Sequence, residues 1–336
     1  MRVRWVLGLV SGLAVLIGSE AARAAEPTDQ EQFFIYELNR ARHDPPAWAA
    51  EFGLGPVIGG DGLPVDLVGV EARPPLAVNE DLVTSARFHS DEMAANRYFG
   101  HQSDVTGDWP NEMARDAGYM LPGFFPDTAN YIESIACGFG PGSSDLTQPI
   151  NALILLIVDE NVPSLGHRVH LLAMNGFNAD FREIGVGYGS DPSFCTNYWS
   201  IHTGREDTIF TFLTGVVFDD LNQNALYDAG EGLGGVTVSA DGLMTLTNAA
   251  GGWSIQAGDG PYDVSCSGSG FVGTATASVS VAGSNREVDC ISGSEAALVN
   301  FVVPEADPRL GRAAALLGLA FAVRRRRGFR SASLRC

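Results

Sequence analysis

The spacing of apolar residues changes near residue 205, and this change divides the chain into two parts. Before it, apolar side chains recur at helical spacing in residues 28–50 and 79–96. After it, short alternating runs are separated by Gly, Asn and Asp, a pattern typical of an antiparallel sandwich. We therefore expect an α+β protein with a helix-rich domain over 28–204 and a small all-β sandwich over 208–303.

The first 24 residues have the composition of a secretory signal peptide. Arg2 and Arg4 form a basic start, an apolar run follows, and Ala22-Arg23-Ala24 supplies a small-x-small cleavage site. The sequence therefore predicts that residues 1–24 are removed and that the protein is secreted, to the cell surface or an extracellular matrix.

The last 33 residues, 304–336, also differ in composition from the region before them. An apolar run over 313–323 is closed by four arginines, 324–327, which is typical of a membrane stop. With Val303-Pro304-Glu305-Ala306 in front of it, this tail resembles the PEP-CTERM class of sorting signals. The resemblance implies transient membrane anchoring through the tail. A plain anchor or a basic tail is the alternative.

The region between these ends is strongly acidic. Residues 25–303 hold 37 acidic and 10 basic side chains, a net charge near −27, and every basic side chain is an arginine. Phosphate neutralisation needs many cations, so this balance argues against a nucleic-acid partner. It favours solubility and an affinity for divalent cations.

Five cysteines are present, and export permits disulfides. Cys266 and Cys290 lie in one segment and are expected to pair. Cys137 and Cys195 flank the histidine-rich part of the first domain and form a second candidate pair. The absence of Cys-x-x-Cys argues against a thiolate zinc site.

Histidines and acidic residues recur in short patterns within the first domain. His101 follows Phe99 and Gly100, Glu133 begins Glu-Ser-Ile-Ala, and His167 follows the acidic pair Asp159-Glu160. Imidazoles beside carboxylates suit a divalent metal or acid–base chemistry. Because these groups are far apart in sequence, only folding can bring them into one cleft.

Residues 28–204 resemble the CAP superfamily (cysteine-rich secretory, antigen 5 and pathogenesis-related proteins) in its bacterial secreted form. The resemblance implies an α-β-α sandwich with a cleft that holds two histidines and two acidic groups. By position these are His101, Glu133, His167 and Glu160, with Asp159 as the alternative second acid, and Zn²⁺ or a similar ion is the implied cofactor. The matching segments, in family order, are residues 75–82, 86–93, 98–101, 118–119, 133–136, 166–172 and 183–188.

The remaining histidines of this region are expected to have structural roles. His89 has the spacing of a core or helix-surface residue, and His202 lies on a predicted strand. His170 lies one turn after His167, where it would either support that residue or pack. Glu183 is a weaker candidate for the cleft. No Gly-x-Ser-x-Gly elbow and no His-Glu-x-x-His motif occurs.

A second candidate metal site lies in the second domain. Residues 220–231 place oxygen donors at the spacing of a twelve-residue calcium loop, although Ala225 stands where glycine is usual. The surrounding stretch resembles the B-type repeats of surface adhesins (Cna-B-like or serine-aspartate-repeat), which implies a calcium-bound sandwich; a solvated acidic turn is the alternative. The expected calcium donors are Asp220, Asn222, Asn224, the carbonyl of Leu226, Asp228 and Glu231.

Three functions are consistent with these patterns. The first is an exported CAP-domain protein whose cleft binds a divalent metal and an extracellular ligand, with a lipid, a sterol or an envelope component implied by the resemblance. The second is a metal-dependent hydrolase or peptidase in which Glu133 or Glu160 is the general base. The third is a non-catalytic surface or matrix adhesion protein with an inert cleft.

Overall fold

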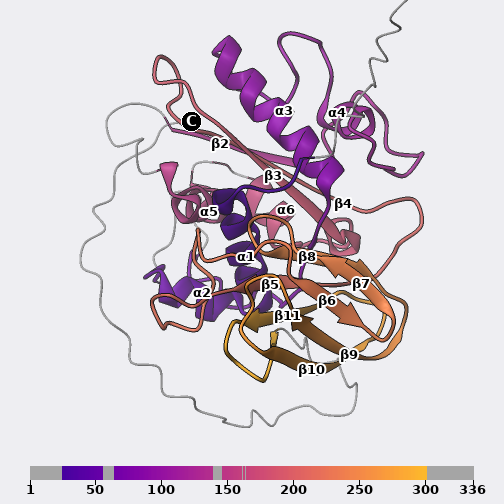
Figure 1. Ribbon diagram of the computed structural model, residues 1–336. Coiled ribbons are helices and arrows are strands. Elements are labelled where there is room, and N and C mark those ends of the chain that lie inside the picture. Colours follow the sequence, from indigo (N-terminus) through magenta and orange to yellow (C-terminus); the bar gives the residue numbers. More distant parts are fainter. Residues whose placement is uncertain (1–24, 56–63, 139–145, 161, 163, 301–336) are drawn as a thin grey trace, which may run out of the picture.

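The computed structural model describes residues 25–55, 64–138, 146–160, 162 and 164–300 (Figure 1). The predicted signal peptide and the predicted sorting tail lie outside the described residues. Within the described ranges no helix combines the length and the apolar character that crossing a bilayer requires. The helices are α1 (Asp29–His43), α2 (Pro45–Glu51), α3 (Glu80–Asn96), α4 (Pro110–Asp116), α5 (Pro149–Val158), α6 (Gly166–Leu171) and the 3₁₀ turn η2 (Asn178–Asp180).

The strands form one sheet in the first domain and two in the second. The first sheet has the order β1-β3-β4-β2; the others have the orders β10-β9-β6-β7 and β12-β11-β5-β8. The strands are β1 (Ala77–Val78), β2 (Glu133–Cys137), β3 (Glu183–Gly189), β4 (Tyr198–Gly204), β5 (Phe212–Phe218), β6 (Thr237–Ala240), β7 (Leu243–Leu246), β8 (Gly252–Gln256), β9 (Gly260–Ser267), β10 (Thr274–Val281), β11 (Arg286–Ile291) and β12 (Leu298–Asn300).

The first domain is the expected three-layer α-β-α sandwich. Helix α3 packs along β3 and β4, while α1 and α5 pack together and against β3 and β2 (Figure 1). Alternate residues of β3 face the two layers. Ile184 and Val186 belong to the same buried cluster as residues of α1 and α5, and the glycines between them face α3. The sheet therefore lies between two helical layers.

Glycines in β3 allow α3 to lie close to the sheet. A Cβ atom added to Gly187 would be 2.3 Å from the backbone carbonyl carbon of Ala86, and one added to Gly185 would be 2.1 Å from that of Leu82. No side chain fits at these separations. The Gly-x-Gly pattern of this strand is therefore a packing requirement, and it fixes the height of α3 above the sheet.

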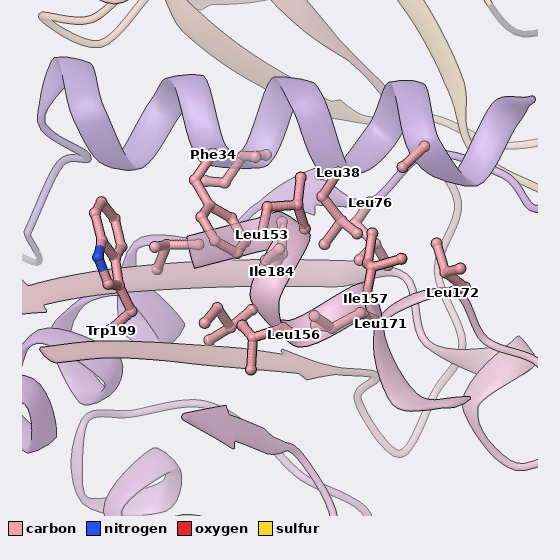
Figure 2. Packing of buried hydrophobic residues seen from close by; sticks show 14 of the residues in the cluster. Phe34, Leu38, Leu76, Leu153, Leu156, Ile157, Leu171, Leu172, Ile184 and Trp199 are labelled. Carbon is pink, nitrogen blue, oxygen red and sulfur yellow. The ribbon is translucent and has the colours of Figure 1, made fainter. Parts of the chain in front are cut away.

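The opposite face of the sheet carries the main apolar core (Figure 2). Phe34 of α1 stacks on Trp199 of β4 with ring centroids 5.7 Å apart, and Leu38 continues this face of α1. Leu153 and Ile157 of α5 are fully buried in the same cluster. Burying side chains of this size stabilises the fold by about 1.5–3 kcal/mol each. This packing fixes α5, whose end carries one of the candidate site residues.

The second domain is a two-sheet sandwich with a core of its own, drawn from residues 213–297. A disulfide between Cys266 of β9 and Cys290 of β11 joins the two sheets, and Cys137 is bonded to Cys195 in the first domain. Both expected pairs are therefore present. The sandwich is not wholly antiparallel, because β11 pairs with β5 in parallel. The chain passes through the other sheet as β9 and β10 before it returns as β11, so no tight hairpin dictates an antiparallel pairing.

The two domains share a packed interface. Asn285, fully buried, donates its side-chain N–H groups to the backbone carbonyls of Pro75 (3.0 Å) and Arg182 (2.7 Å) in the first domain. Tyr227 packs edge-on against Tyr36 of α1, with ring centroids 5.5 Å apart. These contacts satisfy buried polar groups and cover apolar area, so they hold the sandwich against β1, β3 and α1.

Candidate functional site

One buried carboxylate collects three imidazoles. Glu133 begins β2, and its Oε2 lies 2.5 Å from Nδ1 of His89 and 2.9 Å from Nε2 of His202. Its Oε1 lies 2.8 Å from Nδ1 of His101. His89 comes from α3, and His202 is the residue of β4 directly opposite Glu133 in the strand pairing. The packing of α3 on the sheet therefore assembles this group.

The charges within this group are set by burial and by mutual attraction. Burial raises the pKa of Glu133, but the positive charge of His89 and the hydrogen bonds from the three rings hold it well below its usual range. Burial lowers the pKa of His89, yet its attraction to Glu133 raises it overall. Burial lowers the pKa of His202, and its hydrogen bond to Glu133 does not compensate. The surroundings thus favour the ionised form of Glu133, the charged form of His89 and the neutral form of His202.

His101 differs from the other two rings because it reaches solvent. Its side chain is 35% exposed, whereas those of His89 and His202 are fully buried. Asn130 supports it from the loop before β2: its side-chain oxygen accepts from the backbone N–H of Glu133 (2.9 Å), and its amide donates to the Glu133 carbonyl (3.0 Å). The same amide nitrogen lies 3.0 Å from Nδ1 of His101, so this atom has two partners, Glu133 and Asn130. Within the described residues Nε2 of His101 makes no hydrogen bond.

A second histidine–carboxylate pair lies between α5 and α6. Asp159 caps the end of α5 in a left-handed conformation (φ 53°). Its Oδ1 accepts from Nδ1 of His167 (2.7 Å), and its Oδ2 accepts from the backbone N–H groups of His167 (3.0 Å) and Arg168 (3.3 Å). Glu160 is exposed, and it is Asp159, the alternative second acid, that contacts His167.

Arg168 follows His167 directly but does not put its charge beside that ring. Its Nε donates to the carbonyl of Ile157 (2.6 Å) and its Nη2 to the carbonyl of Val158 (2.7 Å), the last carbonyls of α5. Cations at a helix C-terminus are favourable because of the unsatisfied carbonyls there. The arginine therefore joins α5 to α6 and leaves His167 free of a neighbouring cation.

His170 ties α6 to the sheet. The ring is buried between Ser134 Oγ of β2 (2.7 Å from Nδ1) and Thr203 Oγ1 of β4 (2.6 Å from Nε2). Burial is the main cause that lowers its pKa to about 3.

The buried group His89, Glu133 and His202 brings three possible metal-ligand atoms within 4.8 Å of one another, but its geometry is that of hydrogen bonds. Two ligands of a tetrahedral zinc ion lie about 3.4 Å apart, whereas the N···O separations are 2.5 and 2.9 Å. Nδ1 of His202 is buried without a partner. If Nε2 of His202 bound a metal ion, Nδ1 would carry the proton and would be a buried donor without an acceptor. If the neutral ring instead donates from Nε2 to Glu133, Nδ1 carries no proton and is only an unused acceptor.

Two other nitrogen atoms could bind a metal ion, namely Nε2 of His101 and Nε2 of His167. Each ring is held through Nδ1 by a buried carboxylate, which is how metal-binding histidines are usually oriented. Imidazoles oriented in this way suit a divalent ion, and Glu133 and Asp159 would then orient the rings instead of binding the ion. Glu133 accepts from three rings, and the expectation that it is itself a ligand stays a prediction.

Sequence reasoning missed the roles of His89 and His202, which were expected to be structural. The available signal was the predicted strand that contains residue 202, but its pairing with the segment that begins at residue 133 was not predicted. Glu183 contacts neither pair among the described residues. It accepts from the Asn79 amide and the Tyr119 hydroxyl (both 2.8 Å), and burial raises its pKa to about 7.

The calcium-loop candidate in the second domain is a compact turn. Asp220 accepts from the backbone N–H groups of Asn224 (3.0 Å) and Ala225 (2.9 Å), and the carboxylate of Glu231 closes the loop on the backbone of Leu221 (3.0 Å). Ala225 has φ 61°, the left-handed conformation for which glycine is usual at this position. Asp228 accepts from the amides of two loop side chains, Asn222 (2.6 Å) and Asn224 (2.8 Å).

Solved structures with partial likeness to this chain include two with SCP or CAP domains. No family model and no curated protein matches the chain. The chain is similar to an extracellular protein containing an SCP domain from Bacillus anthracis str. Ames, with 25% identity over 40% of this chain and 35% of that one and a TM-score of 0.27. It is also similar to the CAP domain of Enterococcal PrgA, with 16% identity over 62% and 70% of the two chains and a TM-score of 0.31.

Proposed function

We propose that this chain is an exported CAP-type protein whose first domain binds a divalent cation between His101 and His167 and, through the open positions of that ion, an extracellular ligand. The observation that carries the proposal is the matched orientation of the two rings. Each donates from Nδ1 to a buried carboxylate, Glu133 or Asp159, at 2.8 and 2.7 Å. That arrangement leaves both Nε2 lone pairs for a ligand.

The two disulfides support export. Cys137–Cys195 and Cys266–Cys290 join residues 58 and 24 positions apart in the sequence. Such bonds persist in oxidising compartments and are rare in the cytosol. This agrees with the signal peptide expected at residues 1–24. A lipid, a sterol or an envelope component is the ligand class that the resemblance implies.

Binding is better supported than hydrolysis. A metal-dependent hydrolase needs a general base that can reach a metal-bound water. Glu133 is fully buried and its oxygens accept from three imidazoles, and Glu160 is exposed outside both pairs. Asp159 is bonded to His167 and to two backbone N–H groups. Both oxygens of Glu133 and of Asp159 therefore already accept hydrogen bonds, and Glu160 contacts neither histidine among the described residues.

Calorimetric titration of the full chain with Zn²⁺ and Mn²⁺ tests the proposal. We expect one ion per chain at this site and a loss of affinity of about 10-fold or more in His101→Ala and in His167→Ala. His43→Ala is the matched control, because His43 ends α1 and belongs to neither pair. Equal affinity in all four proteins would end the proposal.

The loop of residues 220–231 supports a second binding function. We propose that it takes Ca²⁺ and so stiffens the sandwich that carries the first domain. The observation in favour is the left-handed backbone at Ala225, which gives the loop the sharp turn of a twelve-residue calcium site. The corresponding measurement is described in the Discussion.

A further inference from the structure

The carboxylate of Glu133 is held asymmetrically. Its Oε2 accepts two hydrogen bonds, from His89 and His202, while its Oε1 accepts from His101. The two rings on Oε2 are fully buried, so neither can touch a ligand in the cleft. Any influence they have on the cleft must pass through Glu133.

These two contacts determine where Oε1 lies. A carboxylate bonded at one oxygen only can rotate about its last bond, whereas two donors on Oε2, one from α3 and one from β4, fix both oxygens. The backbone of Glu133 is fixed as well, since its N–H donates to Asn130 at 2.9 Å. Oε1 is therefore held 2.8 Å from Nδ1 of His101.

A carboxylate in this position selects one tautomer of His101. Two partners meet Nδ1 of His101: Oε1 of Glu133 (2.8 Å), which can only accept when ionised, and the amide nitrogen of Asn130 (3.0 Å), which can only donate. The bond to the carboxylate is shorter and charge-assisted, so it outweighs the amide contact and puts the proton on Nδ1 and the lone pair on Nε2. The exposed edge of the ring then offers a lone pair to the cleft. In the other tautomer Nε2 would carry a proton and could bind no cation.

We propose that His89 and His202 are positioning residues that hold Glu133 so that it fixes His101 as the tautomer with its lone pair on Nε2. The inference rests on the proposed function only where it assigns that lone pair to a metal ion. The tautomer itself is a property of the ion-free protein.

Long-range ¹H–¹⁵N correlation spectra of the ¹⁵N-labelled full chain, with metal removed, test this directly. At about pH 8, above the ordinary pKa of imidazole near 6.5, wild type should show His101 protonated on Nδ1. His202→Leu and His89→Leu should convert His101 partly or wholly to the Nε2–H form. The matched variants His202→Gln and His89→Asn keep an N–H donor at the same place and should retain the wild-type signal.

Zn²⁺ titration of the same proteins adds a functional readout. We expect the two leucine variants to lose about 10–100-fold in affinity, the cost typical of a lost supporting contact, and the Gln and Asn variants to keep the wild-type value. A His101 signal that remains Nδ1–H in both leucine variants overturns the inference. If wild type binds no metal but the tautomer still changes, the proposed function fails and the inference stands.

Glu133→Gln provides a second test if a leucine variant does not fold. The glutamine amide has one acceptor oxygen and one donor nitrogen, so it cannot accept from all three rings. We expect its His101 signal to shift toward Nε2–H when the carboxylate is gone. An unchanged Nδ1–H signal in a folded Glu133→Gln protein would also overturn the inference.

Discussion

Asp159 and His167 meet side chain to side chain at 2.7 Å, although Asp159 ends α5 and His167 lies in the first turn of α6. The same carboxylate accepts from two backbone N–H groups of α6, so one residue orients the imidazole and begins the helix that carries it. Glu133 orients the imidazole of His101 in the same way.

The role of Asp159 predicts a difference between two adjacent acids. Asp159→Asn keeps only one acceptor atom where two are used, so we expect Zn²⁺ affinity to fall about 10–100-fold and stability to fall by about 1 kcal/mol. Glu160→Gln, at an exposed position, should change neither. Calorimetric titration and urea unfolding of both variants give these values. A loss of affinity confined to Glu160→Gln would restore the original assignment.

The contact between α3 and the sheet predicts a steric effect. A Cβ atom at Gly187 would be 2.3 Å from the backbone of Ala86, so Gly187→Ala must move α3. We expect a loss of at least about 3 kcal/mol in the free energy of unfolding, because overpacking displaces a whole helix. Gly176→Ala is the control: nothing lies within 4 Å of its added Cβ, and urea unfolding should give a change below about 1 kcal/mol. Similar stabilities for the two variants would contradict the packing described for β3.

Glu183 predicts a pH dependence of stability. Burial raises its pKa to about 7, from the ordinary value of 4.5 that it has in the unfolded chain. Below pH 4.5 the Glu183 carboxyl is protonated in both the folded and the unfolded state, so no charge has to be buried on folding. Between pH 4.5 and 7 the unfolded state ionises first, so stability falls as pH rises, by about 3 kcal/mol at most, and then levels off.

Urea unfolding of wild type and Glu183→Gln across this range isolates the effect. Glutamine does not ionise, so the difference in stability between variant and wild type should move in favour of the variant from pH 4.5 to 7. Glu160→Gln, exposed, is the control and should run parallel to wild type. A constant difference for Glu183→Gln would show that this side chain is ionised at its ordinary pKa.

The loop of residues 220–231 predicts a cation-specific gain in thermal stability. Binding to the folded state alone at a hundredfold excess over Kd stabilises by about 2.7 kcal/mol. We expect Ca²⁺ to raise Tm, Mg²⁺ at equal ionic strength to raise it less, and Asp228→Ala to abolish the difference. Differential scanning calorimetry measures all three, and equal Tm values with and without Ca²⁺ would remove the loop from consideration.

Much of the fold followed from local patterns. The helices expected within 28–50 and 79–96 are present, and Thr28 with Glu31 and Asn79 cap their starts, because capping depends on neighbouring residues alone. The second domain is a sandwich of short strands as expected, since alternation and turn residues are local signals. Helix α4 was missed because seven residues beginning with Pro110 carry no usable periodicity.

The site was harder to predict because tertiary contacts decide it. The sequence suggested His101, Glu133 and His167, but the choice between Asp159 and Glu160 depends on which one lies at the end of α5 and faces α6. His89 and His202 looked like core residues, and they are buried. Their contact with Glu133 depends on the height of α3 and on the register of β2 against β4, which no local pattern states.

Diffraction from crystals grown with Zn²⁺, measured at the zinc absorption edge, tests the central claim most directly. The account predicts one anomalous peak about 2.0–2.1 Å from Nε2 of both His101 and His167. A peak within the group of His89, Glu133 and His202, or two rings too far apart to share one ion, would contradict it.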